Sequence, residues 1–272
     1  MTIKNVCCAG LFFCETGPVG SLSRLTIQIL FIRFPGSLKG RLEPARLQLS
    51  SKGHHMEPIH ILGIHASPVK SGNVSYLLDH TLREANKEEG VATEGIALAG
   101  LSISDCNQCN WCMRKQTPDQ WCAIQDDASP ILEKIRTCDI LVLASPVYFA
   151  RLSGRMACLI DRTRCFIFGR QKQMALRGKI GLAMAVAWTR NAGIETTLES
   201  MHSAFLLHEM WTPSVHHAGV IFGVGAVSGQ RNEDLSYKAN KLGVMEVREA
   251  LQSARELMIK AIQTAKMLKG RS

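Results

Sequence analysis

The stretch HASPVKSGNVS, residues 65–75, determines how this chain folds. It follows a short apolar run, residues 59–64, that predicts a buried strand, and it leads into a segment whose apolar residues recur at helical spacing. A loop from the carboxyl end of a strand to the amino end of a helix presents backbone N–H groups and the positive end of the helix dipole. Such a junction is suited to binding a phosphate. Ser, Pro and Gly are equally common in an ordinary turn, so the loop alone leaves both interpretations open.

The side chains of this loop add donors and positive charge to the junction. Lys70 supplies the charge, Gly72 allows the backbone to approach a ligand closely, and Val74 contributes its backbone N–H group. The side-chain donors are Ser67, Ser71, Asn73 and Ser75. The loop lacks both the Gly-Lys-Ser/Thr of a Walker motif and the glycine triplet of a dinucleotide-binding fold.

Strands and helices alternate along the rest of the chain. Apolar runs predict further strands at residues 91–98, 139–144, 179–187 and 214–221. Helical spacing predicts helices at residues 74–85, 126–135, 153–168, 194–207 and 244–268, the last of which suits packing on a sheet. Residues 223–229 are glycine-rich and predict a mobile stretch. This alternation predicts an α/β fold with right-handed βαβ units and an open parallel sheet.

Ligands of such a sheet bind outside the carboxyl ends of the strands, and two more loops qualify by position. Residues 145–149 (SPVYF) place aromatic side chains beside a backbone that proline fixes, and residues 188–194 offer glycine and polar groups. A phosphate site beside a flat aromatic surface predicts a mononucleotide such as FMN, although core packing is the alternative explanation for the aromatic pair. In these two loops the predicted contacts are Pro146, Val147, Tyr148, Phe149, Thr189, Arg190, Asn191 and Gly193.

A cysteine-rich insert, at about residues 104–125, lies between the second and third predicted strands. Two residues separate Cys106 from Cys109 and Cys109 from Cys112, and Cys122 follows after nine more. Four thiolates in a compact loop can bind an iron–sulfur cluster or a tetrahedral zinc ion, or they can stay unligated as redox-active thiols. Disulfides are the poorer interpretation for an intracellular flavin enzyme in reducing surroundings.

Other residues near the insert have simpler explanations. Asp126 and Asp127 suggest acid–base chemistry or metal binding, but carboxylates at a predicted helix start indicate capping more strongly. Cys138, Cys158 and Cys165 fall inside predicted elements and are expected to be core residues.

These motifs together resemble the flavodoxin-like NAD(P)H-dependent FMN reductases, and within them the iron–sulfur flavoproteins. The resemblance covers residues 57–268 and rests on SPVKSGNVS, SPVYF, LIDR (159–162), the cysteine array and the Asp pair after it. It implies a doubly wound, five-stranded, flavodoxin-like parallel sheet, with the FMN phosphate in the first loop and the flavin ring against SPVYF. It also implies a [4Fe–4S] cluster on the four cysteines. Three departures are Val74 in place of Thr or Ser, the Arg190-Asn191 pair before Gly193, and the long gap before Cys122.

The resulting prediction is an FMN-dependent oxidoreductase or electron-transfer flavoprotein. We expect NAD(P)H or a ferredoxin-like protein as electron donor, and a flavin, a quinone or another acceptor. No general acid or base is assigned, because the flavin carries the electron chemistry. The alternative from a different class is a redox sensor or binding module that keeps the fold without turnover. We expect a cytoplasmic homodimer or homotetramer.

Composition is consistent with one α/β domain preceded by an extension. The net charge of +9 is uneven: residues 1–56 carry +5, so the remaining 216 residues carry only +4 and give no strong case for nucleic acid. We predict that residues 1–56 form a disordered extension outside the domain of residues 57–272, either a transit peptide or a translated segment upstream of Met56. Its best apolar run, residues 25–32, is too short to cross a bilayer, so no membrane partner is expected.

Overall fold

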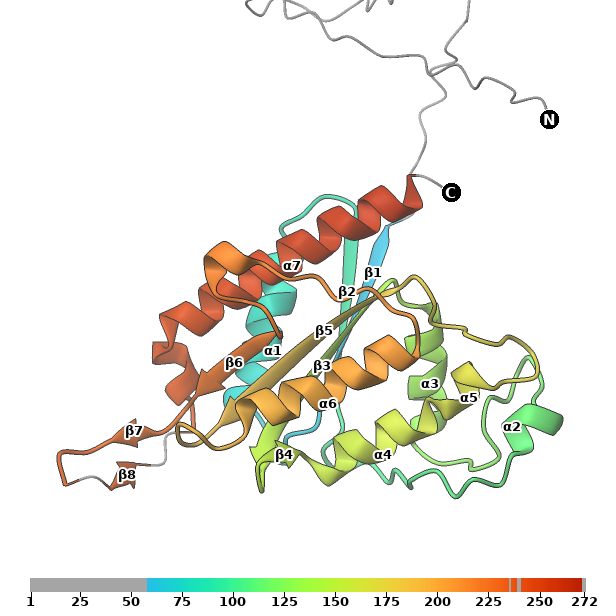
Figure 1. The fold of residues 1–272 in the computed structure, drawn as a ribbon, viewed down its shortest axis with the longest axis horizontal. Helices are drawn as coiled ribbons and strands as arrows, with labels where there is room; N and C mark the ends of the chain where they lie inside the picture. The colour runs from blue at the N-terminus through green and yellow to red at the C-terminus, as the bar shows by residue number, and fades with distance from the viewer. Residues whose placement is uncertain (1–57, 235, 239–240, 271–272) are drawn as a thin grey trace, which may run out of the picture. The chain divides into compact units, whose positions relative to one another are not determined.

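The computed structural model describes residues 58–234, 236–238 and 241–270, all within the second of the chain's two units, His54–Ser272. A parallel sheet forms the centre of this unit (Figure 1). Its strands are β1 (Ile59–His65), β2 (Val91–Ala97), β3 (Ile140–Tyr148), β5 (Ile180–Ala187) and β6 (Val224–Val227). Their order is β2-β1-β3-β5-β6, so the chain reverses its direction of travel across the sheet between β1 and β3. This is the flavodoxin-like order, and the predicted fold is confirmed.

The central strands owe their position to uninterrupted apolar sequence. Every residue of β5 is buried, and β3 is buried from Ile140 to Pro146, as expected for strands that helices cover on both faces. Ile61 of β1 lies opposite Thr93 of β2 on one side and Ile140 of β3 on the other. The register therefore brings the carboxyl ends of β1, β3 and β5 to the same edge of the sheet.

Helices cover both faces of the sheet (Figure 1). On one face lie α1 (Asn73–Ala85) and α7 (Arg248–Lys269). On the other lie α3 (Ala128–Thr137), α4 (Gly154–Arg162), α5 (Arg164–Ile167) and α6 (Ile194–Leu207). The predicted apolar stripe of α7 packs against α1 and the sheet through a row of buried residues that includes Ala254, Met258, Ala261 and Ala265.

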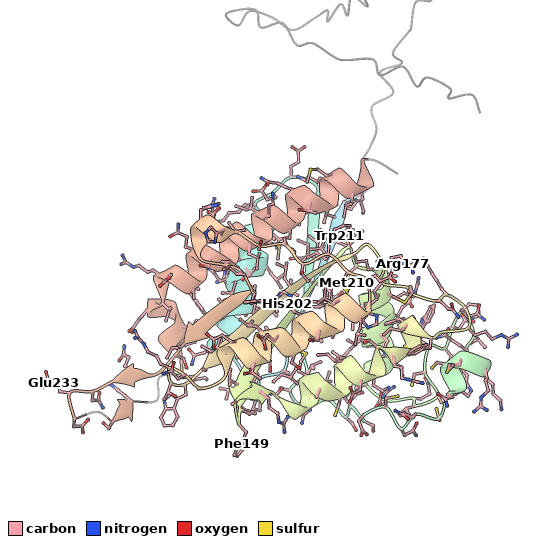
Figure 2. The ribbon with its side chains drawn as sticks, viewed as in Figure 1. Phe149, Arg177, His202, Met210, Trp211 and Glu233 are labelled. Atoms are coloured by element: carbon pink, nitrogen blue, oxygen red, sulfur yellow. The ribbon has the colours of Figure 1, made fainter. Side chains whose placement is uncertain are left out.

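Small elements complete the fold. Within the insert, α2 (Trp111–Arg114) forms one helical turn, and β4 (Arg151–Leu152) folds back on the end of β3. A separate hairpin, β7 (Gln230–Arg231) with β8 (Tyr237–Lys238), extends from the sheet, and Figure 2 places Glu233 near its tip. Short 3₁₀ turns lie at His216–Ala218 and Gly243–Glu246. No helix in the described part of the chain is long and apolar enough to cross a membrane.

The structure corrects two predicted elements. The last strand of the parallel sheet is β6, not residues 214–221, because Gly219 and Gly223 adopt left-handed backbone and the chain turns around a 3₁₀ turn instead. The glycine-rich stretch expected to be mobile therefore contains the strand. The helix predicted at residues 153–168 ends and restarts at Thr163, whose hydroxyl donates to the Ile160 carbonyl oxygen at 2.6 Å and competes with the helical pattern. The predicted extension, residues 1–56, lies outside the described residues.

Candidate functional site

The three predicted loops all lie at the carboxyl edge of the parallel sheet. Residues 65–75 follow β1, residues 145–150 span the end of β3, and residues 188–194 follow β5. β1 and β3 are the neighbours between which the strand order reverses. Open α/β sheets bind ligands in the crevice at that point.

The first loop turns tightly into α1. The buried Ser67 accepts a hydrogen bond from the Val69 N–H at 3.2 Å through its hydroxyl oxygen. Gly72 is the residue before α1, and a Cβ added there would lie 2.9 Å from the Val69 side chain. Lys70 and Ser71 are exposed, and Ser71 adopts left-handed backbone. The loop therefore keeps its small residues inside and presents its cation and a hydroxyl to solvent.

Two predicted phosphate donors also have structural partners. The Ser75 hydroxyl donates to the Gly72 carbonyl oxygen at 3.0 Å, so Ser75 supports the turn with its side chain. The Asn73 amide oxygen accepts the Val244 N–H at 2.9 Å and ties α1 to the segment that precedes α7. Val74 is buried in the core and offers the loop only its backbone. The first turn of α1 nevertheless presents N–H groups that the helix itself does not use.

The second loop is a two-residue hairpin turn. Val147 and Tyr148 of β3 pair with Leu152 and Arg151 of β4, which leaves Phe149 and Ala150 as the turn. Both turn residues have positive φ, 49° and 57°, as a type I′ turn requires.

This conformation normally selects glycine or asparagine, so the turn stores strain of a kind that clusters at functional sites. Tyr148 is 44% exposed and Phe149 99% exposed, which excludes core packing as their role. Figure 2 shows Phe149 pointing away from the body of the protein at this edge.

The third loop packs against this turn through a glycine. Gly193 has a φ of 96°, and a Cβ added there would lie 2.4 Å from the Cα of Ala150. Asn191 also adopts left-handed backbone, at a φ of 55°, and Thr189 is half-buried. The structure thus brings the second and third loops into direct contact.

The third loop also borders a groove along the edge strand. Arg190 lines this groove of about 660 Å³ along β6, together with residues of α6 and α7. The role of Arg190 as a flavin contact stays a prediction.

The four predicted cysteines come together in the structure. Cys106, Cys109, Cys112 and Cys122 all line one small cavity of about 10 Å³. Cys165 of α5, predicted to be a core residue, lines it too and is 2% exposed. Cys138 is buried as predicted, whereas Cys158 is only partly covered.

The cavity has a cationic wall. The Arg164 guanidinium lies 4.0 Å from the Cys112 sulfur and also donates to the Asn110 side-chain oxygen at 2.9 Å. Burial raises the pKa of the Cys112 thiol, and the charge on Arg164 opposes that shift. Burial likewise raises the pKa of Cys165. Among the described residues, no three His, Cys, Asp or Glu side chains are arranged to hold a metal ion.

Arg162, at the end of α4, closes the base of the insert. Its guanidinium donates to Asp126 at 2.7 Å, to the Ile124 carbonyl oxygen at 2.8 Å and to the Ser104 carbonyl oxygen at 3.2 Å. Burial tends to raise the pKa of Asp126, but the hydrogen bonds from Arg162 and the Ser104 N–H outweigh it and hold that pKa below its usual range. One buried side chain therefore joins both ends of the cysteine loop.

The capping prediction for the acidic pair was half right. Asp126 accepts the Ala128 N–H at 3.0 Å at the start of α3, as a capping carboxylate does. Asp127 occupies the cap position but accepts the Ser102 N–H at 2.7 Å instead, which ties the start of the insert to α3.

A second anchor of the insert is Gln116, which sequence reasoning missed. This residue is 1% exposed, and its side-chain amide donates to the Trp121 and Cys165 carbonyl oxygens at 3.0 and 3.1 Å. Its side-chain oxygen accepts the Gln171 N–H at 3.0 Å. No local pattern distinguishes a buried Gln in a polar loop, so sequence alone offered no signal for it.

Comparison with known proteins agrees with this geometry. Residues 59–223 match the family described as NADPH-dependent FMN reductase. An iron-sulfur flavoprotein of Methanocaldococcus jannaschii is 35% identical over 215 residues, which cover 77% of this chain and 98% of that one. An iron-sulfur flavoprotein of Methanosarcina thermophila is 30% identical over 198 residues, 72% of this chain and 98% of that one.

The similarity extends to solved structures at lower identity. The crystal structure of RosB with a bound flavin-derived intermediate aligns with a TM-score of 0.58 at 15% identity, covering 78% of this chain and 81% of RosB. At that identity the match shows a shared fold.

Proposed function

The chain belongs to the NADPH-dependent FMN reductase family and to its iron–sulfur flavoprotein branch, so it is an FMN-dependent oxidoreductase, and we propose how it moves electrons. In this proposal, electrons pass between FMN at the carboxyl edge of the sheet and a [4Fe–4S] cluster on the cysteine insert. When bound, FMN supplies hydride or single-electron chemistry and the cluster supplies single-electron transfer. The protein's own residues bind and orient these groups. The observation that carries the cluster half is the gathering of all four spaced cysteines around one cavity.

The first loop holds the phosphate end of FMN in this proposal. The start of α1 presents N–H groups and the positive end of the helix dipole, which together favour an anion. Lys70 and Ser71 are exposed beside it and add a charge and a donor. Gly72 fits as part of the cradle, because a Cβ there would push on Val69 and narrow the turn.

The second and third loops hold the flavin ring. The backbone of the turn at Phe149 and Ala150 is fixed by pairing with β4 and by contact with Gly193. A flat ring system gains stacking and burial against exposed aromatic side chains, and Tyr148 and Phe149 provide them. Strain in the turn supports the same role, because strained non-glycine turns persist where function requires their shape.

The insert suits a cluster by the chemistry of its donors. Soft thiolates prefer iron–sulfur clusters or zinc to hard cations. A four-iron cluster places each thiolate on a separate iron, so its ligands need not converge on one ion. The cavity of about 10 Å³ has room for about one water molecule, so binding a cluster would require the loop to open. Gln108 and Cys109 are exposed on this loop, whereas Arg162 and Gln116 hold its base through buried hydrogen bonds.

Helix α4 connects the two proposed sites. Its first residue, Gly154, follows the hairpin of the flavin crevice, and its last, Arg162, lines the cysteine cavity. Nine residues of helix rise by about 13 Å. We propose that electrons enter at the flavin from NAD(P)H, or at the cluster from a ferredoxin-like protein, and leave from the other site.

An anaerobic absorption spectrum with metal, sulfide and flavin analysis tests the proposal. Protein reconstituted with iron, sulfide and FMN is expected to contain one FMN and about four irons and four sulfides per chain, the content of one cubane. Stoichiometric zinc without sulfide would overturn the cluster, and failure to retain FMN would overturn the flavin site. Anaerobic oxidation of NADH and NADPH then identifies the donor, since a ferredoxin-fed protein would oxidise neither.

A further inference from the structure

Arg162 is a buried charge whose hydrogen-bonding groups are only partly satisfied by its partners. Its side chain is 0% exposed. An isolated buried cation is strongly unfavourable, so such groups are normally paired and fully hydrogen-bonded. The two terminal nitrogens meet this need through Asp126 and two backbone carbonyl oxygens at the ends of the cysteine loop.

The third nitrogen of the same guanidinium has no oxygen acceptor among the described residues, and the thiol that interacts with this side chain is that of Cys122. Arg162 Nε is buried and lacks a hydrogen-bond partner among the described residues. A buried donor without a partner is unfavourable, and each such group in a native fold calls for an explanation such as an unplaced ligand. Arg162 also lines the cavity that Cys122 and the other insert cysteines share.

We infer that the Nε–H of Arg162 donates a hydrogen bond to the sulfur of Cys122 when that thiolate ligates the cluster. This inference rests on the proposed function, because it requires the cluster to be present. A thiolate bound to iron is an anionic acceptor, so it satisfies the orphaned donor with a charge-assisted hydrogen bond. Arg162 is thus a positioning residue: it holds the ends of the loop with its terminal nitrogens and a ligating sulfur with Nε.

The hydrogen bond has an electronic consequence. Donation to a ligating sulfur withdraws electron density from the cluster and stabilises its reduced, more negative form. Hydrogen bonds to the sulfurs are among the factors that set the reduction potential of such clusters. Arg162 therefore raises the potential of the cluster above the value that the four cysteines alone would give.

A second arginine requires a control. Arg164 lies 4.0 Å from the Cys112 sulfur, but it approaches with a terminal nitrogen and is only partly buried. Arg114 donates a terminal nitrogen to the Cys109 carbonyl oxygen at 3.1 Å. A ¹⁵N label placed only at arginine Nε therefore reports the proposed bond from Arg162 and not the terminal nitrogens through which Arg164 and Arg114 approach the cysteines.

The decisive experiment uses the full chain with its cluster. Protein carrying ¹⁵N only at arginine Nε is reconstituted anaerobically and reduced, and pulsed electron paramagnetic resonance measures nitrogen coupling to the cluster. We expect a ¹⁵N coupling in the wild type that persists in Arg164→Lys. An absent coupling, or one that disappears in Arg164→Lys, would overturn the assignment to Arg162.

A potential measurement gives the second readout. Arg162→Lys keeps the positive charge but removes the Nε–H, so the potential of the variant that retains a full cluster is expected to fall while the flavin potential stays the same. Arg155→Lys, on the same helix but outside the cysteine cavity, is the matched control and is expected to leave the cluster potential in place. A loaded Arg162→Lys protein with the wild-type potential would contradict the inference. Wild-type protein that binds flavin but no iron or sulfide would instead show that the proposed function itself has failed.

Discussion

Gly193 and Ala150, from two loops that are 43 residues apart in sequence, touch so closely that the Cα of Ala150 occupies the space a side chain at residue 193 would need. The separation is 2.4 Å from the position of an added Cβ. This contact fixes the strained turn at Phe149 and Ala150 against the start of α6. The proposed surface for the flavin ring therefore depends on a residue that need not touch the flavin.

Gly193→Ala is expected to displace this turn and weaken FMN binding. The substitution forces a methyl group into the Ala150 backbone and also imposes a positive φ on alanine, a strain of about 1–2 kcal/mol. Gly90→Ala is the matched control, because Gly90 has a φ of 73° and no atom within 4 Å of an added Cβ. Both variants are expected to lose stability in denaturant unfolding, but only Gly193→Ala should raise the FMN dissociation constant. Equal FMN affinities in the two variants would contradict the role of the contact.

Lys70→Ala is expected to weaken binding of FMN but not of riboflavin, which lacks the phosphate. Exposed ion pairs contribute up to about 1 kcal/mol, so the loss is about fivefold and shrinks as salt is added. Lys87→Ala, on the exposed side just beyond α1, serves as control, because Lys87 pairs with Glu84 at 2.6 Å. Flavin fluorescence titration at two ionic strengths measures the effect. Equal losses for FMN and riboflavin would place Lys70 away from the phosphate.

The fourth cysteine of the array follows a gap of nine residues, and the structure offers two candidates for the fourth cluster ligand. Cys109→Ala is expected to lose iron and keep FMN, because the flavin loops lie at the other end of α4. Cys158→Ala is the control and is expected to keep its iron, since Cys158 does not line the cavity. Cys122→Ala should behave like Cys109→Ala. If it instead keeps all of its iron, Cys165 becomes the fourth ligand, because this residue lines the same cavity.

Acid sensitivity is expected from His208, which is buried beside the break between α4 and α5. Its Nε2 lies 2.8 Å from the Thr163 hydroxyl oxygen, and burial lowers its pKa to about 4. The unfolded chain, with an ordinary histidine pKa of about 6.5, takes up this proton first. His208 therefore leaves the free energy of unfolding at its full value above pH 6.5. As the pH falls towards 4, this free energy decreases by roughly 3 kcal/mol in total.

His208→Gln tests this dependence, because the Gln side chain can keep a hydrogen bond to Thr163 but does not titrate. The free energy of unfolding, measured by denaturant titration between pH 7 and pH 4, is expected to fall less steeply in the variant than in the wild type. His217→Gln, at an exposed position, should leave the slope as it is. Identical slopes in all three proteins would show that His208 is not the responsible group.

Sequence patterns predicted the elements whose burial follows a regular pattern along their length. β5 and α6 lie within one residue of their predicted bounds, because an unbroken apolar run or an amphipathic period is visible locally. β6 was missed because it is a four-residue edge strand that contains Gly225 and follows a turn at Gly223. Its pairing with β5, rather than its own composition, makes it a strand.

The features of the candidate site also divide into those that local sequence patterns predict and those that depend on distant contacts. The loops and the cysteines could be predicted because their residue types and spacings are close together in sequence. The roles of Arg162 and Gln116 could not, because both depend on contacts with backbone atoms many residues away. The left-handed turn at Phe149 and Ala150 was also invisible, since neither residue type favours that conformation.

The clasp that Arg162 forms between residues 104 and 124 has a consequence for how this insert can vary in length. The guanidinium fixes the separation of the loop ends, whatever lies between them. Closing a longer loop costs only a logarithmic increment, so four extra residues added to the nine between Cys112 and Cys122 cost about 0.3 kcal/mol. The interval before the last cysteine is therefore free to lengthen or shorten, whereas a shift of Arg162 along α4 would release both ends of the loop at once.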